Sequence, residues 1–178
     1  MKVSLHIHVN LAPLRRFKKA ITEDALGFLD VAIKQWGMIF KAFLQDRFDT
    51  FSKGGGDWAP LAESTIRRRR AGKKGSRRVS ILRDTGLLFG ALDPTSVDPP
   101  GAISRRIPFG IEVGYGGPQR HGEGHATIAD IASYHQEGNK NLPQRKIIVP
   151  PDDATVDLCA QVMDKAISKI IKDTDNDA

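Results

Sequence analysis

The sequence predicts an α+β fold, in which a small antiparallel sheet packs with a long N-terminal helix and a C-terminal helix. Apolar residues recur at steps of three and four over 22–51 and over 152–172, which is the period of amphipathic helices. Short apolar runs near the N-terminus and around Pro108 have the length and composition of strands. The chain has 178 residues, enough to bury a core, and we expect a single domain over 1–178.

The first expected element is a strand, within a segment 1–21 that also contains a short basic link. Apolar residues at positions 3, 5, 7 and 9 alternate with polar ones, as in a half-buried strand. His6 and His8 would share its outer face, where two imidazoles can in principle hold a metal ion together. Because the spacing marks no third ligand, we favour two solvated histidines.

The helix over 22–51 is the longest expected element. Thr22 is its expected N-cap, and Glu23 and Asp24 suit the positive end of the helix dipole. At about 1.5 Å per residue it would be roughly 45 Å long, so we expect part of it to pack beyond the domain core. Its apolar face predicts a core or a subunit interface rather than a ligand site, because it is rich in aromatic residues: Trp36, Phe40, Phe43, Phe48 and Phe51.

The remaining elements are shorter and are separated by glycine and proline. Glycines at 54–56 end the long helix, Pro60 suits the first turn of a new helix, and Gly138 marks a helix end. In chain order we expect helices over 61–70, 81–92 and 127–137, strands over 103–106, 110–115 and 146–149, and a disordered tail over 173–178.

The positive charge is concentrated in one segment. The chain carries 27 Lys and Arg against 21 Asp and Glu, a net charge of +6. Eight of the basic residues and no acidic ones lie within 67–78, which leaves 19 basic and 21 acidic residues elsewhere. We therefore expect a flexible basic loop over 66–79 on a nearly neutral body. Its basic residues form the predicted interaction site: Arg67, Arg68, Arg69, Arg70, Lys73, Lys74, Arg77 and Arg78.

The composition argues against several classes of protein. No apolar run approaches the roughly twenty residues that a membrane-spanning helix needs, and the first ten residues alternate rather than forming a signal sequence. The single cysteine, Cys159, excludes an internal disulfide framework and lies on the apolar stripe of the C-terminal helix. We expect a protein folded in a reducing cytoplasm, with no membrane partner.

The sequence offers no catalytic constellation. The glycines at 54–56 precede no phosphate-loop lysine and serine pair, and no serine or cysteine stands in a nucleophile elbow. His121 and His125 flank Glu123 in a pattern like that of a zinc site, and His135 is a further candidate ligand. Two glycines interrupt the interval and disfavour the helix that a zinc-protease motif requires. We therefore expect no metal, no cofactor and no enzymatic activity.

The basic loop has two interpretations. Lysine and arginine can bind nucleic acid through its phosphates, because each contact releases counterions. No aromatic residue lies within 67–78 to stack on bases, so such binding would follow backbone charge rather than sequence. The alternative is a solvated, disordered loop, or a loop that meets an acidic surface of a partner protein, and this second interpretation is the one we favour.

An ordered series of motifs covers the chain from about residue 40 onward. It resembles the tail completion, or virion morphogenesis, proteins of tailed phages, including the head–tail joining (neck) proteins of Mu-like phages. The motifs are Trp58-Ala59-Pro60-Leu61 with Ser64 and Thr65, the basic stretch, Ile81-Leu82-Arg83-Asp84-Thr85-Gly86-Leu87-Leu88, Ile111-Glu112-Val113-Gly114, Ala132-Ser133-Tyr134-His135-Gln136-Glu137-Gly138 and Pro143-Gln144-Arg145.

This resemblance implies an α+β fold and a structural role in the virion neck or tail, after synthesis in the host cytoplasm. It implies a ring of identical subunits, with a hexamer as the candidate size, that contacts other neck, connector or tail proteins. DNA passing through the channel is a further candidate contact. The structural motif residues that it implies are Trp58, Leu61, Leu82 and Gly86 after the long helix, Tyr134, His135 and Gly138 at a turn against the sheet, and Arg145 in a polar contact.

Overall fold

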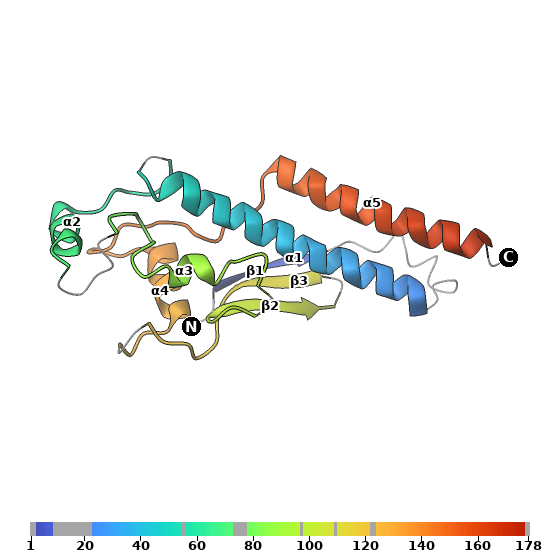
Figure 1. Cartoon of the computed structure of the whole chain (residues 1–178), viewed down its shortest axis with the longest axis horizontal. Helices are drawn as coiled ribbons and strands as arrows, with labels where there is room; N and C mark the ends of the chain where they lie inside the picture. The colour runs from blue at the N-terminus through green and yellow to red at the C-terminus, as the bar shows by residue number, and fades with distance from the viewer. Residues whose placement is uncertain are drawn as a thin grey trace.

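A computed structural model of the chain describes residues 3–8, 23–54, 56–72, 78–96, 98–108, 110–121 and 124–176. The protein is elongated, and helix α1 (Glu23–Phe51) runs along most of its length (Figure 1). Helix α5 (Asp153–Asn176) lies beside α1, and the sheet lies against another side of α1. Three shorter helices gather at one end. The predicted α+β fold, with its long N-terminal and C-terminal helices, is confirmed.

The sheet has three antiparallel strands in the order β1-β3-β2. Strand β1 (Val3–His8) pairs with β3 (Gly110–Tyr115), which pairs on its other side with β2 (Ala102–Ile107). The strands expected over 103–106 and 110–115 are therefore β2 and β3, and the expected N-terminal strand is β1. Every residue of the central strand β3 is buried, and its Tyr115 hydroxyl donates a 2.8 Å hydrogen bond to the carbonyl of Leu88.

The apolar face of α1 meets both the sheet and α5. Its most buried side chains include Ile33, Phe40, Leu44 and Phe48. Gly37 faces β3 so closely that a Cβ there would collide with the side chain of Ile111, so the missing side chain lets helix and sheet approach. Helix α5 packs along α1 as part of the same core. Packing of α1 beyond the domain core stays a prediction.

Helix α5 contributes one stripe to the core. Its Met163 is buried, and Val162, Ile167 and Ile170 pack partly buried beside it. The indole Nε1 of Trp36 donates a 2.7 Å hydrogen bond to the carbonyl of Cys159, which ties the two long helices together. The Cys159 side chain is half-buried, and burial raises the pKa of its thiol.

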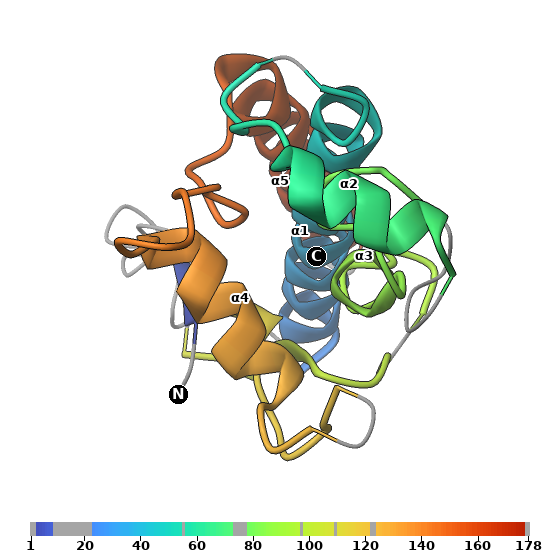
Figure 2. The same ribbon diagram turned by 90° about the vertical axis from the view of Figure 1, so that its left-hand side faces the viewer.

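Three short helices cover the end of the molecule that faces the viewer in Figure 2. They are α2 (Glu63–Arg70), α3 (Leu87–Gly90) and α4 (Ile128–Glu137). A capping box begins α4: the Thr127 hydroxyl accepts from the backbone N–H of Asp130, and the Asp130 carboxylate accepts from that of Thr127. None of the helices in the described ranges combines the length and hydropathy that a membrane span requires.

Several predicted boundaries are wrong. The helix expected over 81–92 is reduced to α3, because Leu82 and Gly86 adopt positive φ angles of 57° and 82° that no helix continues through. Residues 66–70 of the expected basic loop belong to α2, and 73–77 lie outside the described residues. The expected disordered tail begins too early, because α5 continues to Asn176. The expected cap at Thr22 lies outside the described residues.

No strand forms over 146–149, because a side chain takes the place of a neighbouring strand. The amide oxygen of Gln136 accepts from the backbone N–H groups of Ile147 and Ile148, at 2.9 and 3.0 Å. Its amide nitrogen donates to the carbonyl of Ile148 at 2.8 Å. One glutamine at the end of α4 therefore satisfies three backbone groups of a buried extended segment.

We predict that Gln136→Met will destabilise the fold by about 2–4 kcal/mol. The substitution preserves side-chain size but leaves three backbone groups without partners, and each such loss costs about 1–3 kcal/mol before relaxation and solvation offset part of it. Urea unfolding measures the effect. Gln161→Met, on an exposed position of α5, is the matched control and should change stability by less than about 0.5 kcal/mol. Equal stability of the two variants would contradict the assignment.

Candidate functional site

A polar pocket lies where α2, the segment before α3, and α4 come together. Its volume is about 180 Å³. Four of the motif residues named from the sequence line it, from four separate segments of the chain: Leu61, Leu82, His135 and Arg145. The other lining residues are Arg69, Asp84, Thr85, Leu88, His121 and Ile131.

Arg145 fixes the inner wall of the pocket. The residue is only 4% exposed. Its guanidinium donates from Nε to the carbonyl of Ala59 at 2.9 Å and from an Nη to that of Pro60 at 3.0 Å. Its backbone N–H donates to the carbonyl of His135 at 2.7 Å, at the end of α4. Arg145 therefore joins the segment before α2 to α4.

Trp58 reinforces the same junction from the core side. Its side chain is buried and packs edge-on against Phe48 and Phe51 near the end of α1. Its indole Nε1 donates a 3.0 Å hydrogen bond to the carbonyl of Lys146, next to Arg145. The indole and the guanidinium thus hold neighbouring residues of the same extended segment.

Arg69 forms the opposite wall, although it belongs to the basic stretch. One Nη donates to the carbonyls of Arg78 and Ser80, at 3.3 and 2.8 Å. Its Nε lies 3.5 Å from the Asp84 carboxylate, and the Arg69 side chain is only 11% exposed. Arg69 therefore holds the chain that returns from the basic loop, instead of projecting into solvent.

Two histidines complete the pocket. The backbone N–H of His121 donates to the carbonyl of Ala126, and the ring Nε2 lies 3.1 Å from the hydroxyl of Thr85. His135 comes from α4, and its ring Nδ1 is buried without a hydrogen-bond partner among the described residues. Burial, followed by the positive charges of Arg145 and Arg69, lowers the pKa of His135 to about 4. His135 is consequently neutral at pH 7.

The two guanidinium groups influence each other across the pocket. Burial lowers the pKa of Arg145, and the charge of Arg69 lowers it further. Arginine stays protonated in proteins, so both groups carry charge. Among the described residues, Asp84 is the one carboxylate that lines the pocket, so its two arginines and one aspartate together carry a charge of +1.

The remaining basic residues lie elsewhere. Arg67, Arg68 and Arg70 are exposed on the outer face of α2, and Arg78 is also exposed. Lys73, Lys74 and Arg77 lie outside the described residues. The expected single basic loop is thus divided, because Arg69 is drawn inward while its neighbours on α2 face solvent.

Two glycines of the motif series adopt backbone conformations near the pocket that favour glycine. Gly86 has a φ of 82° and provides the left-handed residue from which α3 begins. Gly138 has a φ of 68° at the end of α4, and a Cβ there would lie 2.8 Å from the backbone nitrogen of Gln144. Gly138 therefore lets the 144–148 segment approach the helix end. The Tyr134 side chain is 49% exposed.

The other candidates do not assemble into a site. His125 is exposed, Glu123 lies outside the described residues, and the His6 and His8 side chains are likewise not described. Within the described part of the chain, no three His, Cys, Asp or Glu side chains are grouped to hold a metal ion.

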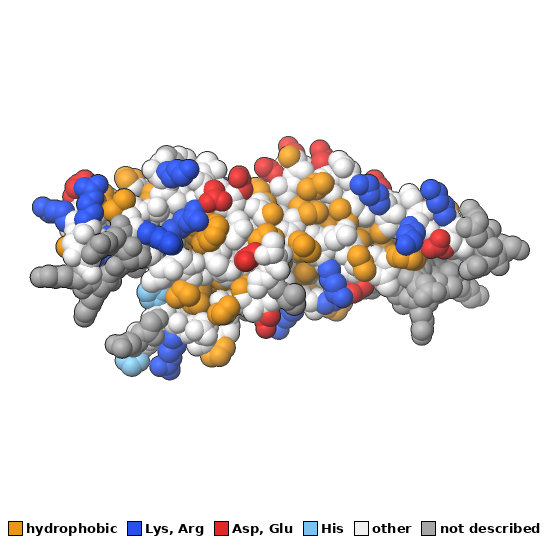
Figure 3. All heavy atoms as spheres, viewed as in Figure 1, with side chains coloured by type: hydrophobic (Ala, Val, Ile, Leu, Met, Phe, Trp, Pro, Cys, Tyr) orange, Lys and Arg blue, Asp and Glu red, His pale blue; other side chains and the backbone are white. Residues whose placement is uncertain are grey.

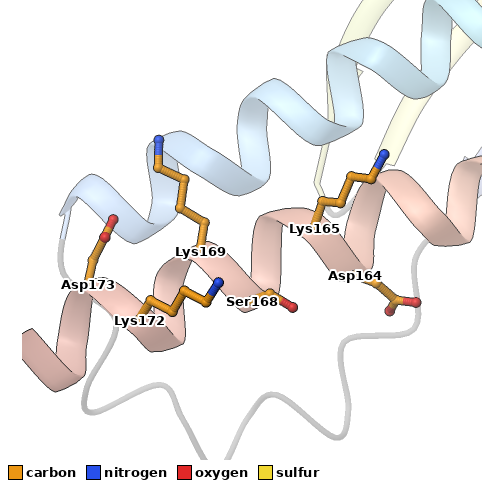
Figure 4. A pocket seen from close by; sticks show the side chains of 6 residues that line it. All are labelled: Asp164, Lys165, Ser168, Lys169, Lys172 and Asp173. Atoms are coloured by element: carbon orange, nitrogen blue, oxygen red, sulfur yellow. The ribbon is translucent and has the colours of Figure 1, made fainter.

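Two open depressions lie away from the pocket. One, of about 380 Å³, follows the last turns of α5, where it is lined by three lysines, two aspartates and a serine (Figure 4). Its lysines point in different directions, and Lys169 lies 4.2 Å above the ring of Phe28. The other, of about 410 Å³, borders β2 beside Arg105. In the described part of the chain, neither is lined by residues of the motif series.

Comparison of this chain with known protein families, curated proteins and solved structures finds no match.

Sequence reasoning missed Arg69, Asp84 and Thr85 as pocket residues. The four arginines of 67–70 look alike in the sequence, and a run of four charged side chains was expected to face solvent as a whole. A usable signal was present, because Thr65, Ile66 and Arg69 follow helical spacing and form the half-buried face of α2. Asp84 and Thr85 lie within the motif that runs from Ile81 to Leu88, but nothing local indicates that they face α2 and α4.

We predict that the fold loses stability as the pH falls from 6.5 toward 4, through His135. Above pH 6.5, the His135 imidazole is mainly neutral in both the folded and the unfolded chain. The unfolded chain takes up a proton first, because the folded pKa is about 4 against an ordinary 6.5. The loss levels off below pH 4 and amounts to at most about 3 kcal/mol. Urea unfolding at successive pH values measures it.

His135→Gln should flatten this pH dependence, because it removes the group that titrates. His125→Gln is the control, since His125 is exposed. An unchanged slope in His135→Gln, with the same slope in the control, would show that another group is responsible.

Proposed function

We propose that this protein is a structural component of a tailed-phage virion, a tail completion or neck protein that acts as a ring of identical subunits. The motif series that resembles this family supports the proposal. The observation that carries it is the presence of two complementary surface patches at separate places on an elongated subunit. Its work is assembly through protein interfaces rather than catalysis.

The first surface, the α2 patch, consists of Arg67, Arg68 and Arg70. All three are exposed at the C-terminal end of α2, and the one acidic residue of that helix, Glu63, lies in its first turn. Figure 3 shows Lys and Arg side chains gathered at this end of the molecule.

The second surface, the α5 patch, lies at the start of α5 and combines acidic and apolar side chains. Asp152, Asp153 and Asp157 are exposed there. Val156 and Leu158 are 49% and 46% exposed, which is high for large apolar side chains. Acidic side chains stand out along this edge of the molecule in Figure 3, with apolar side chains beside them.

This arrangement favours contact between unlike patches. Two copies of the α2 patch would repel each other, so an interface that sets this patch against itself is disfavoured. Contact between the α2 patch of one copy and the α5 patch of the next pairs opposite charges. Such a heterologous contact repeats from copy to copy, and it gives a ring when the rotation closes. Val156, which shares a helix face with Asp153 and Asp157, would add apolar burial at about 25 cal/mol per Å².

The ring would occupy the virion neck or tail and contact other neck, connector or tail proteins. DNA passing through the channel would meet basic side chains that the subunit interface leaves free. A hexamer is the ring size that the family resemblance suggests.

A small nucleic-acid-binding protein is the second candidate, favoured by the exposure of three arginines on one helix. Such a patch would bind phosphates with strong salt dependence. Helix α2 has no aromatic residue to stack on bases, so sequence preference would be weak. The α5 patch has no role in this alternative, and this difference separates the two functions.

We predict that reversing the charge of either patch will weaken self-association at least tenfold. The basic-patch variant is Arg67→Glu with Arg68→Glu and Arg70→Glu, and it retains Arg69. The acidic-patch variant is Asp153→Lys with Asp157→Lys, and it retains Asp152, which accepts the backbone N–H of Thr155 at the start of α5. Sedimentation equilibrium at low salt measures the association. Combining both variants in one chain should restore much of it, because complementarity returns with the signs exchanged.

The control is Lys53→Glu with Lys140→Glu, which changes exposed charges outside both patches and should leave association unaltered. Far-UV circular dichroism verifies that each variant is folded. A wild-type chain that stays monomeric at high concentration would contradict the ring. DNA affinity that falls in the basic-patch variant, without any effect of the acidic-patch variant on association, would favour the nucleic-acid alternative.

A further inference from the structure

We propose that the polar pocket between Arg69 and Arg145 binds a small oxyanion, namely a carboxylate or phosphate group. A free anion and a carboxylate on a protein side chain present the same chemistry to these two guanidinium groups. This binding site is independent of the ring, because neither the α2 patch nor the α5 patch contributes a lining residue.

The first argument is a buried cation without a counter-ion. The Arg145 guanidinium donates to two backbone carbonyls, which satisfy hydrogen bonds but do not neutralise its charge. Among the described residues it forms no ion pair with a carboxylate, and Arg145 is almost completely buried. Burying an unpaired charge is costly, so an anion that reaches it would be stabilised by more than a surface contact provides.

The second argument is that a second cation faces the same space. The Arg69 side chain is also largely buried, and it stands near a single pocket carboxylate, Asp84, at 3.5 Å. Burial, followed by repulsion from the Arg69 guanidinium, lowers the pKa of Arg145. An oxyanion between the two guanidinium groups would turn this repulsion into two attractions.

Further hydrogen-bonding groups line the pocket beside the two cations. Thr85 and His121 form a hydroxyl–imidazole pair, and which of the two donates depends on the imidazole tautomer. The Nδ1 of His135 has no hydrogen-bond partner among the described residues. These groups can complete the hydrogen bonds of an oxyanion that the arginines attract.

The volume restricts the ligand to a small group. The pocket measures about 180 Å³, below the roughly 300–1,000 Å³ of pockets that hold drug-sized molecules. A carboxylate or phosphate with a few waters fits this space, because one water occupies about 30 Å³. A nucleotide would have to leave its sugar and base outside.

The test titrates the full-length wild-type chain with sodium phosphate, with sodium acetate and with a tetraglutamate peptide, at pH 7 and constant ionic strength maintained with sodium chloride. NMR of histidine-labelled protein follows the imidazoles, and thermal unfolding follows stability. We expect saturable shifts of the His121 and His135 signals, little change at His125, and a melting temperature that rises with ligand concentration.

Arg69→Gln should weaken this binding at least tenfold. The control is Arg120→Gln, which removes an exposed charge next to His121 without altering the pocket lining, and it should bind as the wild type does. If Arg69→Gln fails to fold, His121→Leu replaces it, with an expected loss of threefold or more. Circular dichroism verifies the folding of each variant.

The outcomes separate the sources of the anion. Saturation by acetate and the peptide assigns the pocket to a protein carboxylate, and saturation by phosphate alone assigns it to a free anion. Linear shifts with all three ligands, or equal weakening by Arg69→Gln and Arg120→Gln, would overturn the proposal. Because association of the subunits is measured separately, either proposal can fail while the other stands.

Discussion

The buried guanidinium of Arg145 joins parts of the chain that lie far apart in sequence. It ties the segment before α2 to the end of α4, while Trp58 fixes the adjacent carbonyl from the core around α1. Hydrogen bonds from a charged donor are about twice as strong as neutral ones, and they are strongest where water is excluded. The position of α4 relative to the long helices depends on this junction, and so does the pocket, because α4 supplies His135.

The junction also explains how one short basic helix acquires two different faces. Arg69 lies toward the pocket and holds the carbonyls of Arg78 and Ser80, and the arginines on either side of it face solvent. A helix places residues three and four positions apart on one face, so four consecutive arginines cannot all share an environment. The inward arginine supports the proposed oxyanion site, and the outward ones support the proposed contact between subunits.

The sequence predicted those helices and strands that the spacing of apolar residues alone determines. The long helices and the strand pair have strong local patterns, and Gly138 marked the end of α4 because only a glycine suits its left-handed backbone beside Gln144. The segment over 146–149 was mistaken for a strand because its apolar run is strand-like. Its hydrogen bonds instead go to the side chain of Gln136, a tertiary contact that no local pattern encodes. The same limit applies to the candidate site, since the motif residues were named without any indication that Leu61, Leu82, His135 and Arg145 would meet.

The central claim is that the protein works by fitting against copies of itself, through the basic end of α2 and the acidic start of α5. Electron cryo-microscopy of the concentrated wild-type protein tests this most directly, because it shows both the symmetry and the contact surfaces. The account predicts closed rings in which each α2 end meets the α5 start of the next subunit. Dispersed single subunits, or a ring whose contacts leave both surfaces in solvent, would contradict it.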